Sequence, residues 1–391
     1  MPSRHFTFRL SLFNAVLFLG SGILLPFLPL WLKDRGLPDT QVTLVVGLMM
    51  AIRIIGIPAG TFVADLTRRR RTVIVFCAFG STLCYLLMAA MTGFWPILIC
   101  GMLAAALMAP LVPLSEVLAI EGSAHYGIDY GRIRLWASLS FLAGSLGAGL
   151  LLELIPVSFV ILLVAAAQGM GALATLLLPR DEALPAAPAQ PVHVAAVMAT
   201  VGSVSVVVFL LAAGLGQASH GFLYAVGSLY FVDLGYSKSV IGLLWAASVL
   251  AEVLMFAFSN RFYRALGSVR LIMLGTALAA LRWTATGLAP PLAALFLIQT
   301  LHAASFGLTH LGTMHFIRER VPGHIRNTVQ GLYSVLSGGV LLSGAMWISG
   351  PLYVHLGGAA WFVMAAGAAL ASALAVVLWR ISPRAPAAAD T

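Results

Sequence analysis

The sequence is short of charge and of cysteine. Only 9% of its 391 residues are Asp, Glu, Lys or Arg, whereas 61% are hydrophobic. One soluble core cannot bury so large an apolar fraction, so the composition indicates an integral membrane protein. The three cysteines, Cys77, Cys84 and Cys100, lie in apolar runs without the spacing of a metal site or a disulfide framework. We expect them to be core residues.

Long apolar stretches fill almost the whole chain. A bilayer core needs roughly 20 apolar residues per helix, and about twelve such stretches follow one another. The first has no small-residue cleavage site after it, so we expect it to stay in the mature protein. We predict membrane-spanning helices at 8–31, 41–64, 72–92, 95–118, 132–153, 157–178, 197–231, 240–259, 269–288, 291–316, 327–351 and 358–380.

A proline-rich segment separates the first six predicted helices from the last six. The stretch "PRDEALPAAPAQPVHVAA", 179–196, lacks apolar periodicity, which is typical of a flexible connector. The predicted fold is therefore an all-α membrane protein with two six-helix bundles. The bundles are expected at 1–178 and 197–380, with a cytoplasmic linker at 179–196 and a disordered tail at 381–391.

Positive charges gather on alternate loops. If both termini are cytoplasmic, the outer loops hold only Lys33, Arg35 and Lys238, and the inner segments hold nearly all the arginines. Positively charged loops stay in the cytoplasm, so we expect both termini there. The net charge of +9 then reflects membrane topology, and we expect no nucleic-acid partner.

The two halves also contain related sequences. "KDRGLPDTQVTLVVGLMMAIRIIGIPAG" aligns with "VDLGYSKSVIGLLWAASVLAEVLMFAFS" when Gly36 is placed on Gly235, and Arg53 then falls on Glu252. Parallel repeats of this kind place a substrate site between the halves, near the bilayer midplane.

Several motifs carry a family resemblance. "GTFVADLTRRRR", residues 60–71, resembles the major facilitator superfamily signature between helices 2 and 3, although the usual glycine after the aspartate is missing. "SNRFYRALG", residues 259–267, is similar to its degenerate echo in the second half. "RIIGIPAGTFVAD", "PLSEVLAIEG" and "YGRIRLWASLSF" resemble the 3-phenylpropionic acid transporter group, a relative of lactose-type and nucleoside proton symporters.

The resemblance implies a secondary transporter of the bacterial inner membrane that works by alternating access as a functional monomer. Its expected partners are a small-molecule substrate, protons and the lipid bilayer, with no cofactor. We expect proton-coupled import of a small organic acid, such as a phenylpropionate-like aromatic carboxylate. An exporter or facilitator of a sugar or nucleoside, or a non-transporting receptor or scaffold, are the alternatives. The sequence shows no nucleophile–base pair or metal cluster, so we expect no enzyme.

Charged residues inside apolar spans are costly and usually face a cavity or a partner. In the first half, Arg53 lies near the midplane, where its guanidinium could bind a substrate carboxylate or pair with Glu116. The resemblance to lactose-type symporters implies a Glu116–Arg134 pair at the substrate, with Trp136 or Phe141 as an aromatic wall; a salt bridge closing a gate is the alternative. Asn14 could line the cavity or bond a neighbouring helix.

In the second half, Glu252, Arg282 and His302 lie at depths that a long arginine could bridge. Lactose-type symporters are similar here, but a further acid of that family appears as Ser305. We predict that Glu252 carries the coupling proton, with His302 as an alternative carrier; a permanent Glu252–Arg282 ion pair is the competing interpretation. His310 shares a helix face with His302, and we expect no metal site.

Three further polar residues, Gln217, His220 and Gln299, could line the cavity or form interhelical hydrogen bonds. At the cytoplasmic end, we predict that Asp65 forms a gating latch with Arg68 and Arg71, because an acid near a helix end can hold neighbouring arginines in one state.

Overall fold

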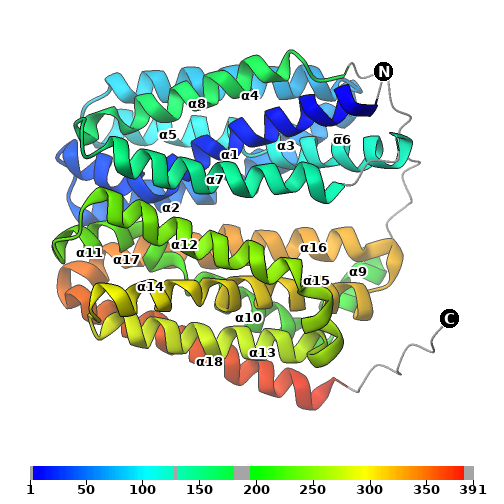
Figure 1. Ribbon diagram of the computed structural model, residues 1–391. Helices are drawn as coiled ribbons and strands as arrows, with labels where there is room; N and C mark the ends of the chain where they lie inside the picture. Colours follow the sequence, from blue (N-terminus) through cyan, green and yellow to red (C-terminus); the bar gives the residue numbers. More distant parts are fainter. Residues whose placement is uncertain (1–2, 127–129, 180–193, 383–391) are drawn as a thin grey trace. The chain divides into compact units, whose positions relative to one another are not determined.

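The computed structural model describes residues 3–126, 130–179 and 194–382. Within those ranges the regular structure is helical and contains no strand. Contacts group the chain into two compact units (Figure 1). The first unit comprises Met1–Ala187, Leu223–Ala246 and Met346–Val354, and the second comprises Pro188–Phe222, Ala247–Ala345 and His355–Thr391. Most of the predicted linker at 179–196 and the tail at 381–391 lie outside the described residues.

The first unit is built mainly from the helices of the first half of the sequence. These helices are α1 (Ser3–Asp34), α2 (Asp39–Ala51), α3 (Arg53–Thr67), α4 (Arg70–Ala90), α5 (Phe94–Met108), α6 (Leu111–Tyr126), α7 (Tyr130–Leu151), the short η1 (Val157–Phe159) and α8 (Val160–Thr175). Helix α1 packs against α7 and α8, and α4 packs against α5 and α8. Gly22 and Gly144 make the α1–α7 approach possible, because a Cβ on either would collide with the backbone of the other helix.

Four elements of the second half also belong wholly or partly to the first unit. They are η3 (Leu223–Gly227), α11 (Ser228–Asp233), the beginning of α12 (Lys238–Ala257) and the middle of α17 (Leu342–Leu356). Glu153 follows α7 and caps the start of α12, where the backbone N–H of Ser239 donates to its carboxylate at 2.8 Å. This bond satisfies one of the free N–H groups at a helix N-terminus. It holds the pKa of the Glu153 carboxyl below its usual range.

The second unit contains most of the second half of the sequence. Its helices are α9 (Val194–Val201), α10 (Val204–Ala218), the rest of α12, α13 (Ser259–Gly287), α14 (Leu292–Thr300), η4 (Ala303–Leu308), α15 (Thr309–Arg320), η5 (Gly323–Ile325), α16 (Arg326–Ser334), η6 (Val335–Leu341), the two ends of α17, η7 (Gly357–Ala359) and α18 (Ala360–Ile381). Helix α13 packs against α15 and α18, and α10 packs against α18. Stacked Phe209 and Phe316 rings lie in the core of this unit.

The number of membrane crossings matches the prediction. Eleven helical stretches of the described chain are long and apolar enough to cross a membrane. The last, Arg326–Ile381, has 56 residues, whereas the next longest has 30. A crossing needs roughly 20 residues, and this stretch is interrupted at Gly357, where φ is +54°. It therefore supplies two crossings, which gives twelve in all.

Breaks inside the spans have local causes that are only partly visible in the sequence. Helix α5 ends and α6 begins around Pro110, which has no backbone N–H to continue a helix. Gly267 has a φ of +71° and divides α13 into a short first segment and the span proper, so the predicted start at 269 was close to the kink. Helices α2 and α3 meet at Ile52, and no proline or glycine at that position indicates a helix break.

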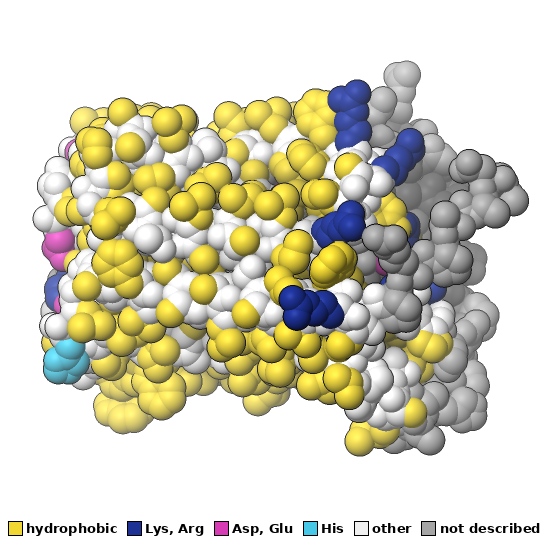
Figure 2. Space-filling view, turned by 90° about the horizontal axis from the view of Figure 1, so that it is seen from below, with side chains coloured by type: hydrophobic (Ala, Val, Ile, Leu, Met, Phe, Trp, Pro, Cys, Tyr) yellow, Lys and Arg dark blue, Asp and Glu magenta, His cyan; other side chains and the backbone are white. Residues whose placement is uncertain are grey.

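The surface is apolar over the length of the helices. Figure 2 shows one face on which hydrophobic side chains predominate, with Lys and Arg gathered toward one end. Large side chains such as Phe62, Phe76, Leu297 and Trp347 are more than half exposed in the isolated chain. Exposed apolar surface on this scale is stable in lipid and not in water, in agreement with an integral membrane protein.

Candidate functional site

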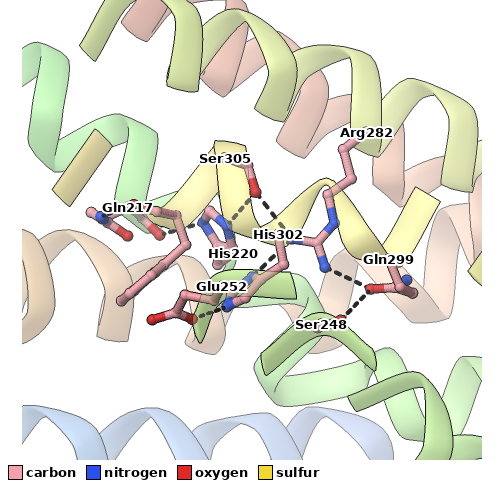
Figure 3. Close-up of polar contacts among 9 residues, drawn as sticks. Gln217, His220, Ser248, Glu252, Arg282, Gln299, His302 and Ser305 are labelled. Carbon is pink, nitrogen blue, oxygen red and sulfur yellow. Dashed lines mark hydrogen bonds and ion pairs between the residues drawn. The ribbon is translucent and has the colours of Figure 1, made fainter. Parts of the chain in front are cut away.

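The second unit holds a cluster of polar side chains that we call the Arg282 network. Its members are Gln217, His220, Ser248, Glu252, Arg282, Gln299, His302 and Ser305 (Figure 3). They come from α10, the turn before η3, α12, α13, α14 and η4. Arg282 and Ser305 are completely buried. Polar groups this deep in an apolar helix bundle must satisfy one another.

Arg282 is the centre of the network. Its Nη1 lies 3.0 Å from His302 Nδ1 and 3.1 Å from Ser305 Oγ, and its Nη2 donates to Gln299 Oε1 at 2.6 Å. Ser248 also donates to Gln299 Oε1, at 3.4 Å. On the other side of His302, its Nε2 lies 3.2 Å from Glu252 Oε2. The structure therefore brings together three of the four residues predicted for proton coupling, Glu252, Arg282 and His302, and places His302 between the acid and the arginine.

Aromatic rings surround these polar groups. The Arg282 guanidinium lies 4.4 Å from the centre of the Trp283 ring, a distance at which a cation and a ring face attract. Along the predicted tenth span, the Phe306 ring stacks on His302 at 5.2 Å and on His310 at 6.1 Å. His302 and His310 thus share a helix face, and the Phe306 ring stacks against both.

Two π-helical segments adjoin the network. His302 directly precedes η4, and His220 lies three residues before η3. A π-helical turn carries one more residue than an α-helical turn and is frequently found at functional sites. It rotates the side chains that follow it, which is why the bonding partners here could not be read from a 3.6-residue period.

The first half contains a different arrangement, centred on Arg53. Helices α2 and α3 form one stretch, Asp39–Thr67, and Arg53 lies at its midpoint. The side chain is exposed in the isolated chain, and its close polar contact within the described part of the chain is a weak one to Met50 Sδ at 3.9 Å. Tyr85 is near enough to interact with it electrostatically. Among the described residues Arg53 has no carboxylate partner, and Glu116 does not pair with it.

The other residues predicted at the substrate site are distributed over α1, α6 and α7. The Arg134 guanidinium lies over the Phe18 ring at 4.8 Å, and its pairing with Glu116 stays a prediction. Trp136 is 53% exposed and Phe141 is half-buried. Asn14 is buried, donates to Leu10 O at 3.0 Å and accepts from Ser115 at 3.4 Å. That second contact is the interhelical bond expected as its alternative role.

The predicted latch residues lie at the end of α3 and the start of α4. Asp65 is exposed and has no ion pair among the described residues. Arg71 donates to the Leu176 carbonyl at 2.6 Å. The ion pair at this end joins Arg70 to Glu121 at 2.7 Å. Arg68 caps α3 in the left-handed conformation, with φ +54°, which glycine adopts more readily.

Sequence reasoning undervalued three members of the network. Gln217, His220 and Gln299 were expected only as cavity-lining or interhelical polar residues, and Ser248 was missed. One signal was available: Ser248 precedes Glu252 by four residues and Gln299 precedes His302 by three, so each shares a helix face with a predicted coupling residue. No group of three His, Cys, Asp or Glu side chains in the described chain could hold a metal ion.

Comparisons with known proteins agree with this architecture. The model of the MFS_1 like family matches residues 7–364. A probable 3-phenylpropionic acid transporter of Escherichia coli (strain K12) is 29% identical over 356 residues, which cover 89% of this chain and 91% of that protein. A maltose permease of Geobacillus stearothermophilus is 25% identical over 334 residues, covering 84% of this chain and 83% of the permease.

Solved structures show the same fold at low sequence identity. The nucleoside transporter NupG superposes with a TM-score of 0.80 at 15% identity, covering 96% of this chain and all of that one. A POT family peptide transporter gives a TM-score of 0.78 at 13% identity, with 99% of each chain covered. The chain therefore belongs to the MFS_1 like family and is a multi-pass membrane transporter of the major facilitator type.

Proposed function

We propose that this transporter imports a small organic acid together with a proton, and that the substrate class is a phenylpropionate-like aromatic carboxylate. The similarity to a probable 3-phenylpropionic acid transporter of Escherichia coli supports the substrate class. Import would proceed by alternating access in the bacterial inner membrane, with the protein acting as a monomer and both termini in the cytoplasm.

Arg53 is the observation that carries the proposal. A guanidinium at the middle of a membrane span is costly unless something compensates its charge, and no carboxylate of the described chain does so. A substrate carboxylate would supply that charge and could accept two parallel hydrogen bonds. The exposed side chain of Arg53 leaves its donors available for such a ligand.

The remaining predicted substrate residues would complete the site. Trp136 and Phe141 offer ring faces for an aromatic substrate. Glu116 and Arg134 would orient it, and Asn14 would support the wall through its bonds within α1 and to α6.

The Arg282 network would supply the proton coupling. Glu252 is the one carboxylate among its eight members, and it shares a hydrogen bond with a histidine that also contacts the arginine. Adding a proton to Glu252 removes the negative charge that balances Arg282, so the network has two states of different net charge. Coupling requires that substrate and proton together permit reorientation. His310 would stand further along the same helix as a second titratable group.

A sugar or nucleoside transporter is the competing proposal, favoured by the maltose permease among the relatives. A neutral sugar has no need of an unpaired cation at the midplane, so the two proposals differ at Arg53. A receptor without transport would show binding but no uptake.

Uptake into proteoliposomes tests the proposal. Labelled 3-phenylpropionate is supplied outside at acid pH with a neutral interior, and protein-free liposomes give the passive entry of the protonated acid, which must be subtracted. We expect protein-dependent accumulation that needs the pH gradient, competition by related carboxylates, and no competition by 3-phenylpropionamide, maltose or uridine. Uptake of maltose or uridine in place of the acid would overturn the substrate class.

Arg53→Gln isolates the anion site. Loss of a charge-assisted hydrogen bond costs about 1.5–3 kcal/mol, so half-saturation should rise roughly 10- to 100-fold for the carboxylate. Arg35→Gln is the matched control, because it removes the same charge near the end of α1, and it should behave as wild type. Equal affinity for the carboxylate in wild type and Arg53→Gln would rule out this anion site.

A further inference from the structure

Arg282 contacts both arms of its network through the same nitrogen. One arm leads from Nη1 to His302 and on to Glu252. The other leads from Nη1 to Ser305 and on to His220, whose Nε2 lies 3.2 Å from Ser305 Oγ (Figure 3). His220 Nδ1 lies 3.2 Å from the Gln217 carbonyl oxygen. His220 and Ser305 are both completely buried.

The chemistry of arginine fixes the direction of the first arm. A guanidinium has donors and no acceptor, so His302 Nδ1 must accept from Arg282 and carry no proton. The proton of the neutral imidazole is then on Nε2, where it is donated to the Glu252 carboxylate. His302 can take a second proton only on Nδ1, and that proton would break the bond to Arg282.

The second arm has an equally definite direction. Arg282 donates to the Ser305 oxygen, so the single hydroxyl proton of Ser305 is free to be donated to His220 Nε2. His220 Nδ1 faces a carbonyl, which can only accept, and therefore carries the proton of that imidazole. The chain from Arg282 to the Gln217 carbonyl then has a donor and an acceptor at every step.

These directions make the two arms unequal when a proton arrives. Among the described residues, the titratable groups in this network are Glu252 from α12, His302 directly before η4 and His220 from the turn before η3. Protonation of the Glu252–His302 arm weakens or removes the acceptor at His302 Nδ1. The Ser305 and Gln299 oxygens are then the remaining acceptors for Arg282 in this network. The Ser305 oxygen can accept from Arg282 only while the Ser305 hydroxyl proton points away from the guanidinium, and it does so when His220 Nε2 accepts that proton.

We propose that His220 is a positioning residue for proton coupling, which acts through the Ser305 hydroxyl to hold Arg282 in the proton-loaded state. The inference rests on the proposed proton-coupled function and adds a residue to it. Weakening the Ser305–His220 arm destabilises the proton-loaded state more than the unloaded state, because His302 also accepts from Arg282 in the unloaded state. Protonation of the network then requires a higher proton concentration.

Two isosteric variants of His220 separate its two nitrogens. Asn places its amide near the position of Nδ1 and lacks an acceptor at Nε2, whereas Gln reaches the position of Nε2 and can accept from Ser305. Ser305→Ala removes the hydroxyl itself with a smaller change in volume. The measured quantity is the outer pH at half-maximal accumulation of labelled 3-phenylpropionate in proteoliposomes, with the melting temperature of each variant in detergent as the control.

We expect His220→Asn and Ser305→Ala to shift this midpoint to lower pH by about half a unit to one unit, the equivalent of one hydrogen bond. The double variant should match either single variant, because both changes interrupt one arm. His220→Gln should stay near the wild-type midpoint. A purely structural role would instead lower the melting temperature and the maximal rate without moving the midpoint.

Each failure has its own signature. Wild-type protein that shows no gradient-driven accumulation contradicts the proposed function. Wild-type accumulation with an unchanged midpoint in Ser305→Ala overturns the role of the second arm, even if His220→Asn does not fold. Additive shifts in the double variant also overturn it, since His220 would then act by another route. Histidine 15N NMR in micelles provides a check without transport: a His220 proton on Nε2 contradicts the proposed chain.

Discussion

Arg53 and Glu252 occupy equivalent places in the two halves of the sequence, yet their surroundings are opposite. Arg53 follows Asp39, the first residue of α2, by 14 residues, and Glu252 follows Lys238, the first residue of α12, by the same number. Arg53 is exposed, with a weak sulfur contact. Glu252 belongs to a network in which histidine, serine and glutamine side chains satisfy a buried arginine.

Under the proposed function, the difference separates two tasks. A binding group needs donors that the protein leaves available, and we propose that Arg53 is such a group. A coupling group needs neighbours whose hydrogen bonds change when a proton arrives, and we propose this role for Glu252 and His302. The two arginines are therefore not interchangeable: Arg53 would bind a ligand, whereas Arg282 hydrogen-bonds to protein side chains.

The same substitution at the two arginines should have very different effects on stability. Arg282→Gln leaves buried acceptors and Glu252 without their cation, so we expect a loss of about 3–5 kcal/mol and a large drop in melting temperature in detergent. Arg53→Gln removes no bond of comparable strength and should change stability by about 0.5 kcal/mol or less. Equal melting temperatures for the two variants would contradict the contrast between them.

Glu252→Gln tests whether the network couples or only supports the helices. If Glu252 carries the proton, the variant should lose gradient-driven accumulation by roughly tenfold or more, while exchange of substrate across the membrane continues. If Glu252 has only a structural role, the variant should lose both activities and should also show lower expression and a lower melting temperature. Accumulation at the wild-type level would leave His302 as the carrier, which His302→Gln would then test in the same assay.

Much of this organisation was predictable because membrane-spanning helices have a strong sequence signal. Twelve apolar stretches predict twelve crossings, and the contrast between a charged side chain and its apolar span identified Glu252, Arg282 and His302. Helical rise alone placed these three at depths that a long arginine side chain could bridge. Pro110 likewise marked a helix break, since the missing N–H is a property of the residue itself.

The connections within the network were not predictable in the same way. A direct Glu252–Arg282 pair was one expectation, but His302 lies between the two side chains. The link from His220 to Ser305 depends on helix rotation near η3 and η4, and π-helical turns have no simple sequence signal. The break at Ile52 has no local signal either, because the nearest glycine and proline in α3 are Gly56 and Pro58.

Arg68→Gly tests a smaller difference, between shape and charge at the end of α3. Arg68 has a φ of +54°, and a left-handed conformation costs an L-residue about 1–2 kcal/mol. After the greater freedom of glycine in the unfolded chain is subtracted, we expect a gain of about half a kcal/mol in stability. Arg69→Gly is the matched control, since its φ is −125°, and it should give no gain.

Transport by Arg68→Gly then shows whether the side chain belongs to the proposed latch with Asp65 and Arg71. A more stable protein with wild-type transport assigns only a structural role to this position. A more stable protein whose introduced cysteines change their accessibility on either side of the membrane supports the latch, because the equilibrium between states would have moved. Asp65→Asn should then move the same equilibrium.

The smallest effect is expected at Glu153, an exposed acid that follows α7 and lies outside the Arg282 network. Its pKa is lowered because the Ser239 N–H donates to the carboxylate at the start of α12. A lowered pKa in the folded protein adds stability above the unfolded pKa of about 4.3, and this stability is lost as the pH falls through the folded value. Glu153→Gln should therefore lower the stability at pH 7 by about half a kcal/mol, a typical value for a charge at a helix N-terminus. The difference from wild type should shrink as the pH falls below about 4, because both side chains are then neutral.

Asp34→Asn is the control for this prediction. It removes an acid at the C-terminus of α1 and should cost no stability at pH 7. Melting temperatures at the two pH values decide the matter: a loss at Glu153 that persists in acid would assign the contact to hydrogen bonding alone. In either case transport should keep its wild-type pH dependence, in contrast to Glu252→Gln.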